Sequence, residues 1–382
     1  MSAGDGPVTR RPLAVASLLD RFETDPDGRL YLRPAGRFST ADGAGSDALP
    51  LAGGPFRFDA CDLLLKSVDG VHMAPVGLAA LRDSAEKGPG RAARRIAALL
   101  ERLSAPRPPF AGLDLSGPAG PAIMGVVNVT PDSFSDGGRY LQRDAAIAHG
   151  RALMAAGARI LDIGGESTRP GAEPVPEDEE LDRVIPVIQS LAGDGAAISV
   201  DTRHAGVMAA ALEAGADIVN DVTALAGDPR GLETVVRAGA PAILMHMQGA
   251  PRDMQVRPSY RDAPLDVFDF LEERVEACLA AGMARADIAV DPGIGFGKTV
   301  AHNVRILADL ALFHGLGCPL VLGVSRKRFI AALAGDSEPA ARLPGSLAAG
   351  LSGLDRGVQI LRVHDVAETA QAVAVWRAVA GA

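Results

Sequence analysis

After residue 120 the chain alternates between short runs of apolar residues and longer amphipathic segments rich in alanine. The short runs are nearly continuous in Val, Ile and Leu, which is typical of strands that are buried on both faces of a parallel sheet. They lie at residues 123–127, 159–163, 197–200, 217–219, 242–245, 287–290, 319–324 and 359–363. Eight strand and helix units over residues 121–382 predict an α/β fold, the TIM (β/α)8 barrel.

The first 120 residues follow a different pattern. Residues 27–38 are typical of a hairpin, and residues 91–103 place apolar positions at helical spacing. Pro and Gly dominate residues 104–120, which predicts a linker. We therefore expect a small N-terminal extension of mixed or mostly helical structure at residues 1–103. No chemistry is readable in it, so a packing or oligomer-stabilising role is the default.

Composition and charge exclude several classes of protein. Apolar residues make up 48% of the chain and charged residues 22%, which is enough to form a sizeable core. The net charge of -9 argues against partners such as nucleic acid or an anionic membrane, although it permits a local basic pocket. Cys61, Cys278 and Cys318 lie far apart, so neither a zinc site nor a disulfide framework is expected. There is no long apolar run and no secretory leader pattern, and we expect a cytoplasmic protein.

Polar residues follow every predicted strand, at the end where barrels of this kind carry their sites. In chain order they are Asn128, Asp162, Asp201, Asn220, His246, Asp291, residues 325–327, and Arg362 with His364. A single Asp or Asn after a strand is commonly a helix cap or turn former, but eight cases together predict a polar mouth. One set has groups that suit a heterocycle: Asp201, Asn220, Asp291 and Lys327. Another set suits an anion with its metal: Asn128, Arg362 and His364.

Lysine is rare in this chain. Of the 38 cationic residues only four are lysine, and two of these, Lys298 and Lys327, fall in strand-end loops. A compact ammonium group is not interchangeable with a guanidinium where one donor must be directed at one acceptor. The sequence GIGFGKT at residues 293–299 is similar to a phosphate-binding P-loop, but its glycine spacing is one residue too short. We therefore reject a nucleoside triphosphate site.

Several long motifs after residue 120 carry a family resemblance. They are MGVVNVTPDSFSDGG, LDIGGESTRPGAEPV, SVDT, IVNDVTA, MHMQGAPRDMQ, DPGIGFGKT, GVSRKRFI and RVHDV. In these motifs and their order, residues 121–382 closely resemble dihydropteroate synthase, an enzyme family of folate biosynthesis. The resemblance implies a transferase that joins 4-aminobenzoate to (7,8-dihydropterin-6-yl)methyl diphosphate, giving 7,8-dihydropteroate and pyrophosphate. It also implies assistance from Mg2+ and a homodimer.

Matched motif by motif, the resemblance assigns roles to individual residues. Asn128 corresponds to the magnesium-contacting asparagine, and Arg362 with His364 to the pyrophosphate ligands. The pterin pocket corresponds to Asp201, Asn220, Asp291 and Lys327. Further substrate-binding positions are Thr168, Arg169 and Pro170 in a mobile loop, then Met245, Phe296, Gly323 and Ser325. The residues expected to act in catalysis are Asp201, Lys327, Arg362 and His364. Arg328 stands where many members have Ser near the aminobenzoate carboxylate, so the partner of that carboxylate is left open.

Two alternative functions suit a pterin-binding barrel. A pterin-dependent methyltransferase handles no diphosphate, so the NVTPDSFSDGG, SRK and RVHD motifs favour the synthase. A non-catalytic pterin-binding homologue is disfavoured because every motif residue that can be matched is present. Pyrophosphate release on mixing the two substrates distinguishes the synthase from both.

Overall fold

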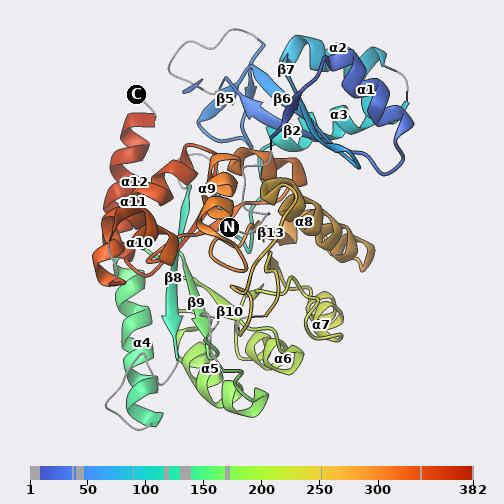
Figure 1. Ribbon diagram of the computed structural model, residues 1–382. Coiled ribbons are helices and arrows are strands. Elements are labelled where there is room, and N and C mark those ends of the chain that lie inside the picture. Colours follow the sequence, from blue (N-terminus) through green and yellow to red (C-terminus); the bar gives the residue numbers. More distant parts are fainter. Residues whose placement is uncertain are drawn as a thin grey trace.

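The computed structural model describes residues 9–36, 38–39, 47–88, 90–115, 120–129, 139–167, 173–250, 252–335 and 338–380. These residues form a smaller N-terminal part and a barrel, and Figure 1 shows the N-terminal part in blue above the barrel. In the described part of the chain, no helix combines the length and apolarity that crossing a membrane requires.

Eight parallel strands form the barrel. They are β8 (Ala122–Asn128), β9 (Ile160–Gly164), β10 (Ala197–Asp201), β11 (Ile218–Asp221), β12 (Ala242–Met245), β13 (Ile288–Asp291), β14 (Val321–Gly323) and β15 (Ile360–Val363). Their order in the sheet is β13-β12-β11-β10-β9-β8-β15-β14. A parallel bridge between Val290 and Leu320 joins the two ends of this order and nearly closes the barrel. The predicted (β/α)8 fold is confirmed.

Helices cover the outside of the strands, as the amphipathic segments predict. They are α4 (Arg139–Ala155), α5 (Glu177–Leu191), α6 (Ala205–Glu213), α7 (Gly231–Ala238), α8 (Ala263–Ala280), α9 (Val300–Ala308), α10 (Arg328–Ala334), α11 (Leu343–Leu354) and α12 (Val366–Ala380), with the 3-10 turns η4 (Arg285–Asp287), η5 (Leu310–Leu316) and η6 (Ala340–Arg342). Side-chain caps mark where two of these helices begin. Asp262 caps α8 through Leu265 N, and Thr299 forms a capping box with His302 at α9.

The Pro- and Gly-rich stretch before the barrel packs into it. Phe110 and Leu115 are buried, and they share a small apolar cluster with the first residues of several barrel strands, such as Ile160 and Ile360. Since these are the amino ends of the strands, the two side chains fill the end of the barrel opposite the polar mouth. A segment with neither helical nor strand periodicity thus contributes to the core.

The N-terminal part has mixed structure, which is one of the two compositions that the sequence predicts. Its elements are β1 (Arg11–Pro12), α1 (Val15–Thr24), β2 (Arg29–Ala35), β3 (Phe38–Ser39), β4 (Leu49–Pro50), β5 (Phe56–Phe58), β6 (Ala60–Ser67), β7 (Gly70–Gly77), α2 (Leu78–Lys87) and α3 (Gly90–Ser104). The main sheet has the order β1-β7-β6-β2. The hairpin expected at residues 27–38 is wrong, because β2 pairs antiparallel with β6 and the long hairpin is β6 with β7.

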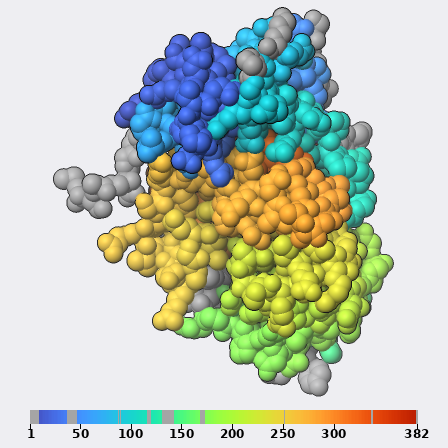
Figure 2. Space-filling model, turned by 90° about the vertical axis from the view of Figure 1, so that its right-hand side faces the viewer, coloured from blue at the N-terminus to red at the C-terminus, as the bar shows by residue number. Residues whose placement is uncertain are grey.

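The N-terminal part packs against one side of the barrel. Tyr31 of β2 meets Phe268 of α8 edge to face, with ring centroids 5.4 Å apart, and Phe268 also packs near Phe313 of η5. Figure 2 shows the blue residues lying directly on the gold and orange segment, which includes α8. The two parts therefore share one apolar core.

Candidate functional site

The carboxyl ends of the strands meet at one mouth, where a fully buried carboxylate joins four strands. Asp162 of β9 accepts a hydrogen bond from Ser199 Oγ at 2.7 Å. It also accepts from Asn220 Nδ2, at 3.3 and 3.2 Å, and from Arg362 Nε at 2.6 Å. The parallel register places Ser199 of β10 beside Asp162, so this pair follows directly from the sheet. Asp162 thereby fixes the side chains that border the mouth.

Arg362 connects Asp162 to Asp201, its second carboxylate partner. The Arg362 Nη2 atom donates to Asp201 Oδ2 at 2.7 Å. Burial raises the pKa of Asp201 to about 7, although Arg362 pulls this pKa down. Burial also acts to lower the pKa of Arg362, but Asp162 and Asp201 outweigh it and leave this pKa raised. Arg362 therefore stays cationic, whereas Asp201 titrates near neutral pH, as groups at active sites often do.

Asp291 and Lys327 are two further residues of the mouth, and each affects the pKa of the other. Asp291, at the end of β13, accepts from Gly293 N at 2.7 Å. Burial raises the pKa of Asp291, with Lys327 acting against it. Burial lowers the pKa of Lys327 to about 8, with Asp291 acting against it. A Cβ atom on Gly323 would lie 3.7 Å from Asp291 Oδ2 and 3.8 Å from Lys327 Nζ, so the three residues border one space.

Lys298 holds the glycine-rich loop between β13 and α9. Its Nζ atom is buried, and it lies 2.9 Å from His246 Nδ1, 2.8 Å from Gly293 O and 2.9 Å from Phe296 O. Burial lowers the pKa of Lys298 well below its usual value. Burial also lowers the pKa of His246 to about 2, so this imidazole is neutral and accepts at Nδ1. These contacts make Lys298 a support of the loop.

Lys327 also contacts the glycine-rich loop, at Ile294 and Phe296. Its Nζ atom donates to Ile294 O and stands 4.6 Å from the centroid of the Phe296 ring, within the range of a cation–π contact. Gly295 has a φ of +86°, and a Cβ atom there would lie only 3.1 Å from Lys327 Cδ. Glycine at this position therefore leaves room for the lysine side chain.

Ser325 and His364 form a third polar group, at the ends of β14 and β15. The Nδ1 atom of His364 is 3.0 Å from Ser325 Oγ, and His364 N donates to the same oxygen at 3.2 Å. Arg326 donates from Nε to Asp365 at 3.0 Å and ties the two loops together. Arg326 has a φ of +58°, so the ion pair holds the turn between Ser325 and Lys327 in a conformation that costs a non-glycine residue energy.

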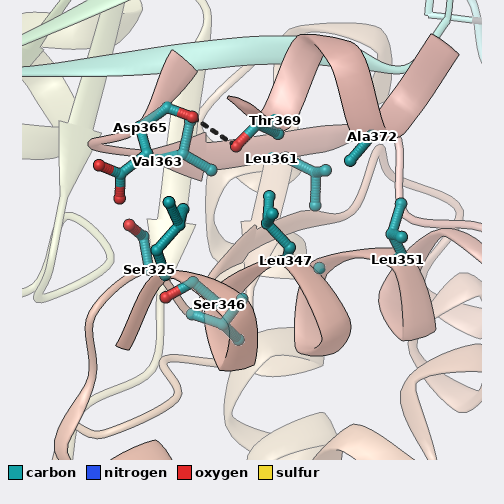
Figure 3. Close-up of a pocket in the computed structure, with 12 residues that line it drawn as sticks. Ser325, Ser346, Leu347, Leu351, Leu361, Val363, Asp365, Thr369 and Ala372 are labelled. Atoms are coloured by element: carbon teal, nitrogen blue, oxygen red, sulfur yellow. Dashed lines mark hydrogen bonds between the residues drawn. The ribbon is translucent and has the colours of Figure 1, made fainter. Parts of the chain in front are cut away.

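A separate apolar pocket lies behind this group, between α11 and α12. Figure 3 shows Leu347, Leu351 and Leu361 around it, with Ser325 and Asp365 at one side. Thr369 Oγ1 donates to Asp365 O at 2.7 Å and closes the first turn of α12 beside it. This pocket lies between the helices and the strand ends, and it is separate from the polar mouth.

The remaining residues expected at the site belong to β8, to β12 and to two loops that lie partly outside the described residues. Asn128 ends β8, in register with Gly164 at the end of β9. Met245 is buried at the end of β12, in register with Asp291. Thr168, Arg169 and Pro170 lie outside the described residues, as do residues 130–138 of the first loop.

Two residues of the mouth, Asp162 and Ser199, have no functional role in the predictions from the sequence. Asp162 was placed at a strand end but in neither functional set, and Ser199 was assigned no role. Both are polar residues within apolar strand runs, and they are partners in the register of neighbouring strands. A polar residue that is buried in a strand requires a partner, and this signal could have found the pair.

This geometry is that of a small-molecule site in a barrel, and comparison with known proteins places the chain in a family. Residues 124–364 match the model of the family described as pterin binding enzyme. The match spans well over half of the chain, and the chain belongs to this family. The whole N-terminal part, from β1 to α3, lies before the matched range.

Its relatives within the family are dihydropteroate synthases. The enzyme of Neisseria meningitidis serogroup C is 49% identical over 262 residues, covering 68% of this chain and 92% of the relative. The enzyme of Escherichia coli strain K12 is 45% identical, and the match covers 70% of this chain and 93% of the relative. A structure of Xanthomonas albilineans dihydropteroate synthase with 4-aminobenzoic acid is 49% identical, has a TM-score of 0.67 and covers 71% of this chain and 97% of its own. Another from the same organism, in complex with 7,8-dihydropteroate, is 45% identical with a TM-score of 0.64, covering 71% and 96%. The resemblance to dihydropteroate synthase is confirmed.

Proposed function

We propose that the chain condenses (7,8-dihydropterin-6-yl)methyl diphosphate with 4-aminobenzoate, giving 7,8-dihydropteroate and pyrophosphate in folate biosynthesis. The observation that carries the proposal is the mouth itself, where Asp201 and Asp291 lie with the cationic groups of Lys327 and Arg362. The relatives whose structures hold 4-aminobenzoic acid and 7,8-dihydropteroate support these substrates.

The pterin ring would take the deep end of the mouth. A reduced pterin presents N–H donors together with carbonyl and ring-nitrogen acceptors. Carboxylates of Asp201 and Asp291 are acceptors for such N–H groups, and Lys327 is a donor for a ring acceptor. Asn220 can offer its amide oxygen, because its Nδ2 atom already donates to Asp162. Three acceptors and one donor at different positions around the mouth define one orientation of the ring.

The charges of the mouth match the charges that develop in the reaction. The carbon–oxygen bond to the diphosphate breaks with its electron pair on oxygen, which leaves positive charge on the pterin methylene carbon. Asp201 stabilises that positive charge, and Arg362 with His364 stabilises the departing anion. An arginine has five N–H donors, so Arg362 can keep both carboxylates and still donate to a phosphate oxygen. The amine nitrogen of aminobenzoate then forms the new bond and loses a proton.

The aminobenzoate would lie on the outer side of the pterin, near Phe296. The ring of Phe296 is held beside Lys327, which would place an aromatic wall at the boundary of the two substrates. Ser325, Arg328 or backbone N–H groups at the start of α10 are the candidates for the carboxylate. We further propose that Thr168, Arg169 and Pro170 close over this substrate.

A magnesium ion fits the donor set if the substrate brings most of its ligands. Among the described residues there is no cluster of three or more His, Cys, Asp or Glu suited to a metal. Mg2+ commonly keeps several waters and takes one or two protein oxygens plus phosphate oxygens. The amide oxygen of Asn128, half-buried at the end of β8, is such a ligand. When bound, the ion would neutralise charge on the leaving diphosphate.

The test is pyrophosphate release. The purified chain is mixed with both substrates and Mg2+, and pyrophosphate and dihydropteroate are measured together. We expect both products in equal amounts, and neither when 4-aminobenzoate is omitted. A flat trace from folded protein would overturn the proposal, and a methyl transfer that depends on a corrinoid protein would point to the methyltransferase.

We also propose a homodimer and a cytoplasmic location. Large apolar side chains are exposed on α9, α10 and α12: Val300, Val304, Leu333, Val375 and Val379. Such side chains favour an interface between copies of the chain. All three cysteines are free thiols, in keeping with a reducing compartment. Light scattering would give the oligomeric state, and a monomer at micromolar concentration would argue against the dimer.

A further inference from the structure

The N-terminal part is attached to the start of α8 by a buried ion cluster. Arg10 donates from Nε and Nη2 to the two oxygens of Asp262, each at 2.9 Å, and from Nη2 to Asp309 at 2.7 Å. The side chains of all three residues are at most 6% exposed. Because Asp262 is also the N-cap of α8, Arg10 holds the residue at which the β12–α8 loop ends.

A second contact, from the β6–β7 hairpin, lies beside the first. Lys66 donates to Asp266 and, at 2.7 Å, to Asp269 Oδ2. The other oxygen of Asp266 accepts from Arg261 N at 2.6 Å. Arg261 Nη2 in turn donates to Ser67 O at 2.8 Å. The hairpin therefore holds both the backbone and the side chain of the last loop residues before α8.

The β12–α8 loop in turn holds the glycine-rich loop between β13 and α9. The Tyr260 hydroxyl, next to Arg261 in the chain, donates to Gly297 O at 2.7 Å. Gln255 Nε2 donates to Gly295 O at 2.6 Å. Gly295 and Gly297 flank Phe296, the ring that lies beside Lys327. Hydrogen bonds, joined by the backbone of residues 260–262, thus connect Lys66 and Arg10 to the proposed aminobenzoate site.

We propose that the N-terminal part is a positioning element for catalysis: through Arg10 and Lys66 it holds the end of the β12–α8 loop, and this loop, through Tyr260, fixes Phe296 and Lys327 against the substrates. The inference rests on the proposed function for its kinetic consequence. It assigns a role to residues that precede the matched family range. Holding a binding loop in one conformation before the substrate arrives improves affinity by reducing the ordering that binding requires.

A matched pair of variants separates positioning from mere docking. Lys66→Met removes a cation that pairs with the first turns of α8, whereas Arg95→Met removes one that pairs with Glu272 at 2.7 Å further along the same helix. The two pairs are buried to similar extents, with side chains between 16% and 22% exposed. Glu272 pairs with Arg95 and Arg102, both on α3, and lies beyond the loop.

We expect Lys66→Met to raise the KM for 4-aminobenzoate by roughly twofold to fivefold, the range that loss of a partly exposed ion pair supports, with a smaller change in kcat. Arg95→Met should leave this KM unchanged at a similar loss of thermal stability. Equal KM values in the two variants, whether raised or unchanged, would overturn the proposal.

A second pair tests the link itself by removing one oxygen atom. Tyr260→Phe deletes the bond to Gly297, and Tyr31→Phe deletes a bond of the same length, 2.7 Å, to Asp269. Asp269 keeps its pairs with Lys66 and Arg29 in Tyr31→Phe, and the link to the loop runs through Asp266, so only Tyr260→Phe should raise the KM. Its effect should not add to that of Lys66→Met because both act through one loop. Fully additive effects would contradict a shared path.

Hydrogen–deuterium exchange gives a readout that needs no turnover. In the ligand-free protein, amides at residues 293–299 should exchange faster in Lys66→Met and Tyr260→Phe than in Arg95→Met and Tyr31→Phe. Identical exchange in all four variants would refute the positioning role. If the parent chain releases no pyrophosphate, the proposed function fails while this comparison still decides the structural part.

Discussion

The pairing of Arg362 with two buried carboxylates leads to a prediction that can be worked out from its hydrogen bonds. Arg362→Gln removes the cation that holds Asp201 and is proposed to bind the leaving diphosphate. A hydrogen bond to a charged group contributes roughly 1.5–3 kcal/mol. If the transition state loses one such bond, kcat/KM falls roughly 10-fold to 150-fold.

The same substitution should change the pH dependence. Asp201 must be ionised to stabilise a cation, so kcat/KM should rise with pH through the Asp201 pKa of about 7. Because Arg362 lowers this pKa, its removal should raise it and move the acid limb to higher pH. The loss caused by Arg362→Gln should therefore be largest on the acid side.

Initial rates of pyrophosphate release over a range of pH measure both effects. Arg362→Lys is the control, because it keeps a positive charge near Asp201 but loses the planar fork that reaches two carboxylates. It should lose activity while its acid limb stays near that of the parent. Thermal unfolding checks that each variant is folded, since Asp162 is buried beneath the arginine. A kcat/KM of Arg362→Gln within threefold of the parent, with an unmoved acid limb, would refute this reasoning.

Four further substitutions follow from the site. Asp201→Asn should lower kcat/KM on the order of 100-fold and abolish the acid limb, and a loss of only a few-fold would remove Asp201 from cation stabilisation. Lys327→Arg should move the alkaline limb above the Lys327 pKa of about 8, and an unmoved limb would assign it to another group. Lys298→Met should cost about 1–3 kcal/mol of unfolding free energy for each buried acceptor left unpaired, seen as a lower Tm, and an unchanged Tm would disprove its support of the loop. Asn128→Ala should raise the Mg2+ concentration needed for half-maximal activity, with EDTA abolishing turnover of the parent, and an unchanged Mg2+ requirement would place the ion elsewhere.

The barrel could be predicted because its signal is local and periodic. Strands such as residues 123–127 are apolar on both faces, and each is followed by a helix before the next strand begins. Knowing that the strands are parallel is enough to gather their carboxyl ends at one mouth, which predicts that Asp201, Asp291 and Arg362 all border it. The direct pairing of Arg362 with Asp201 does not follow from the sequence, which places the two residues in different sets.

What the sequence could not supply depends on contacts between distant residues. Arg362 and Asp162 are 200 positions apart, and nothing in either local motif says that they pair. The segment at residues 29–35 does form a strand, but its partner is β6, which begins at residue 60, and not the segment that follows it directly. Phe110 likewise lies in a stretch whose Pro and Gly content predicts a linker, whereas the open end of the barrel provides a place to bury it.

The scarcity of lysine now has a physical explanation in three of its four positions. The single nitrogen of Lys298 contacts the His246 imidazole and the backbone oxygens of His246, Gly293 and Phe296. A planar guanidinium has its donors fixed in one plane and could not contact all of these acceptors. Lys327 combines a backbone carbonyl, an aromatic face and the nearby Asp291. Lys66 bridges two carboxylates one turn apart on α8. In each of these three positions a single compact donor serves several acceptors. Two of these positions form and support the mouth, and the third is the N-terminal contact that we infer to hold the loop beside it.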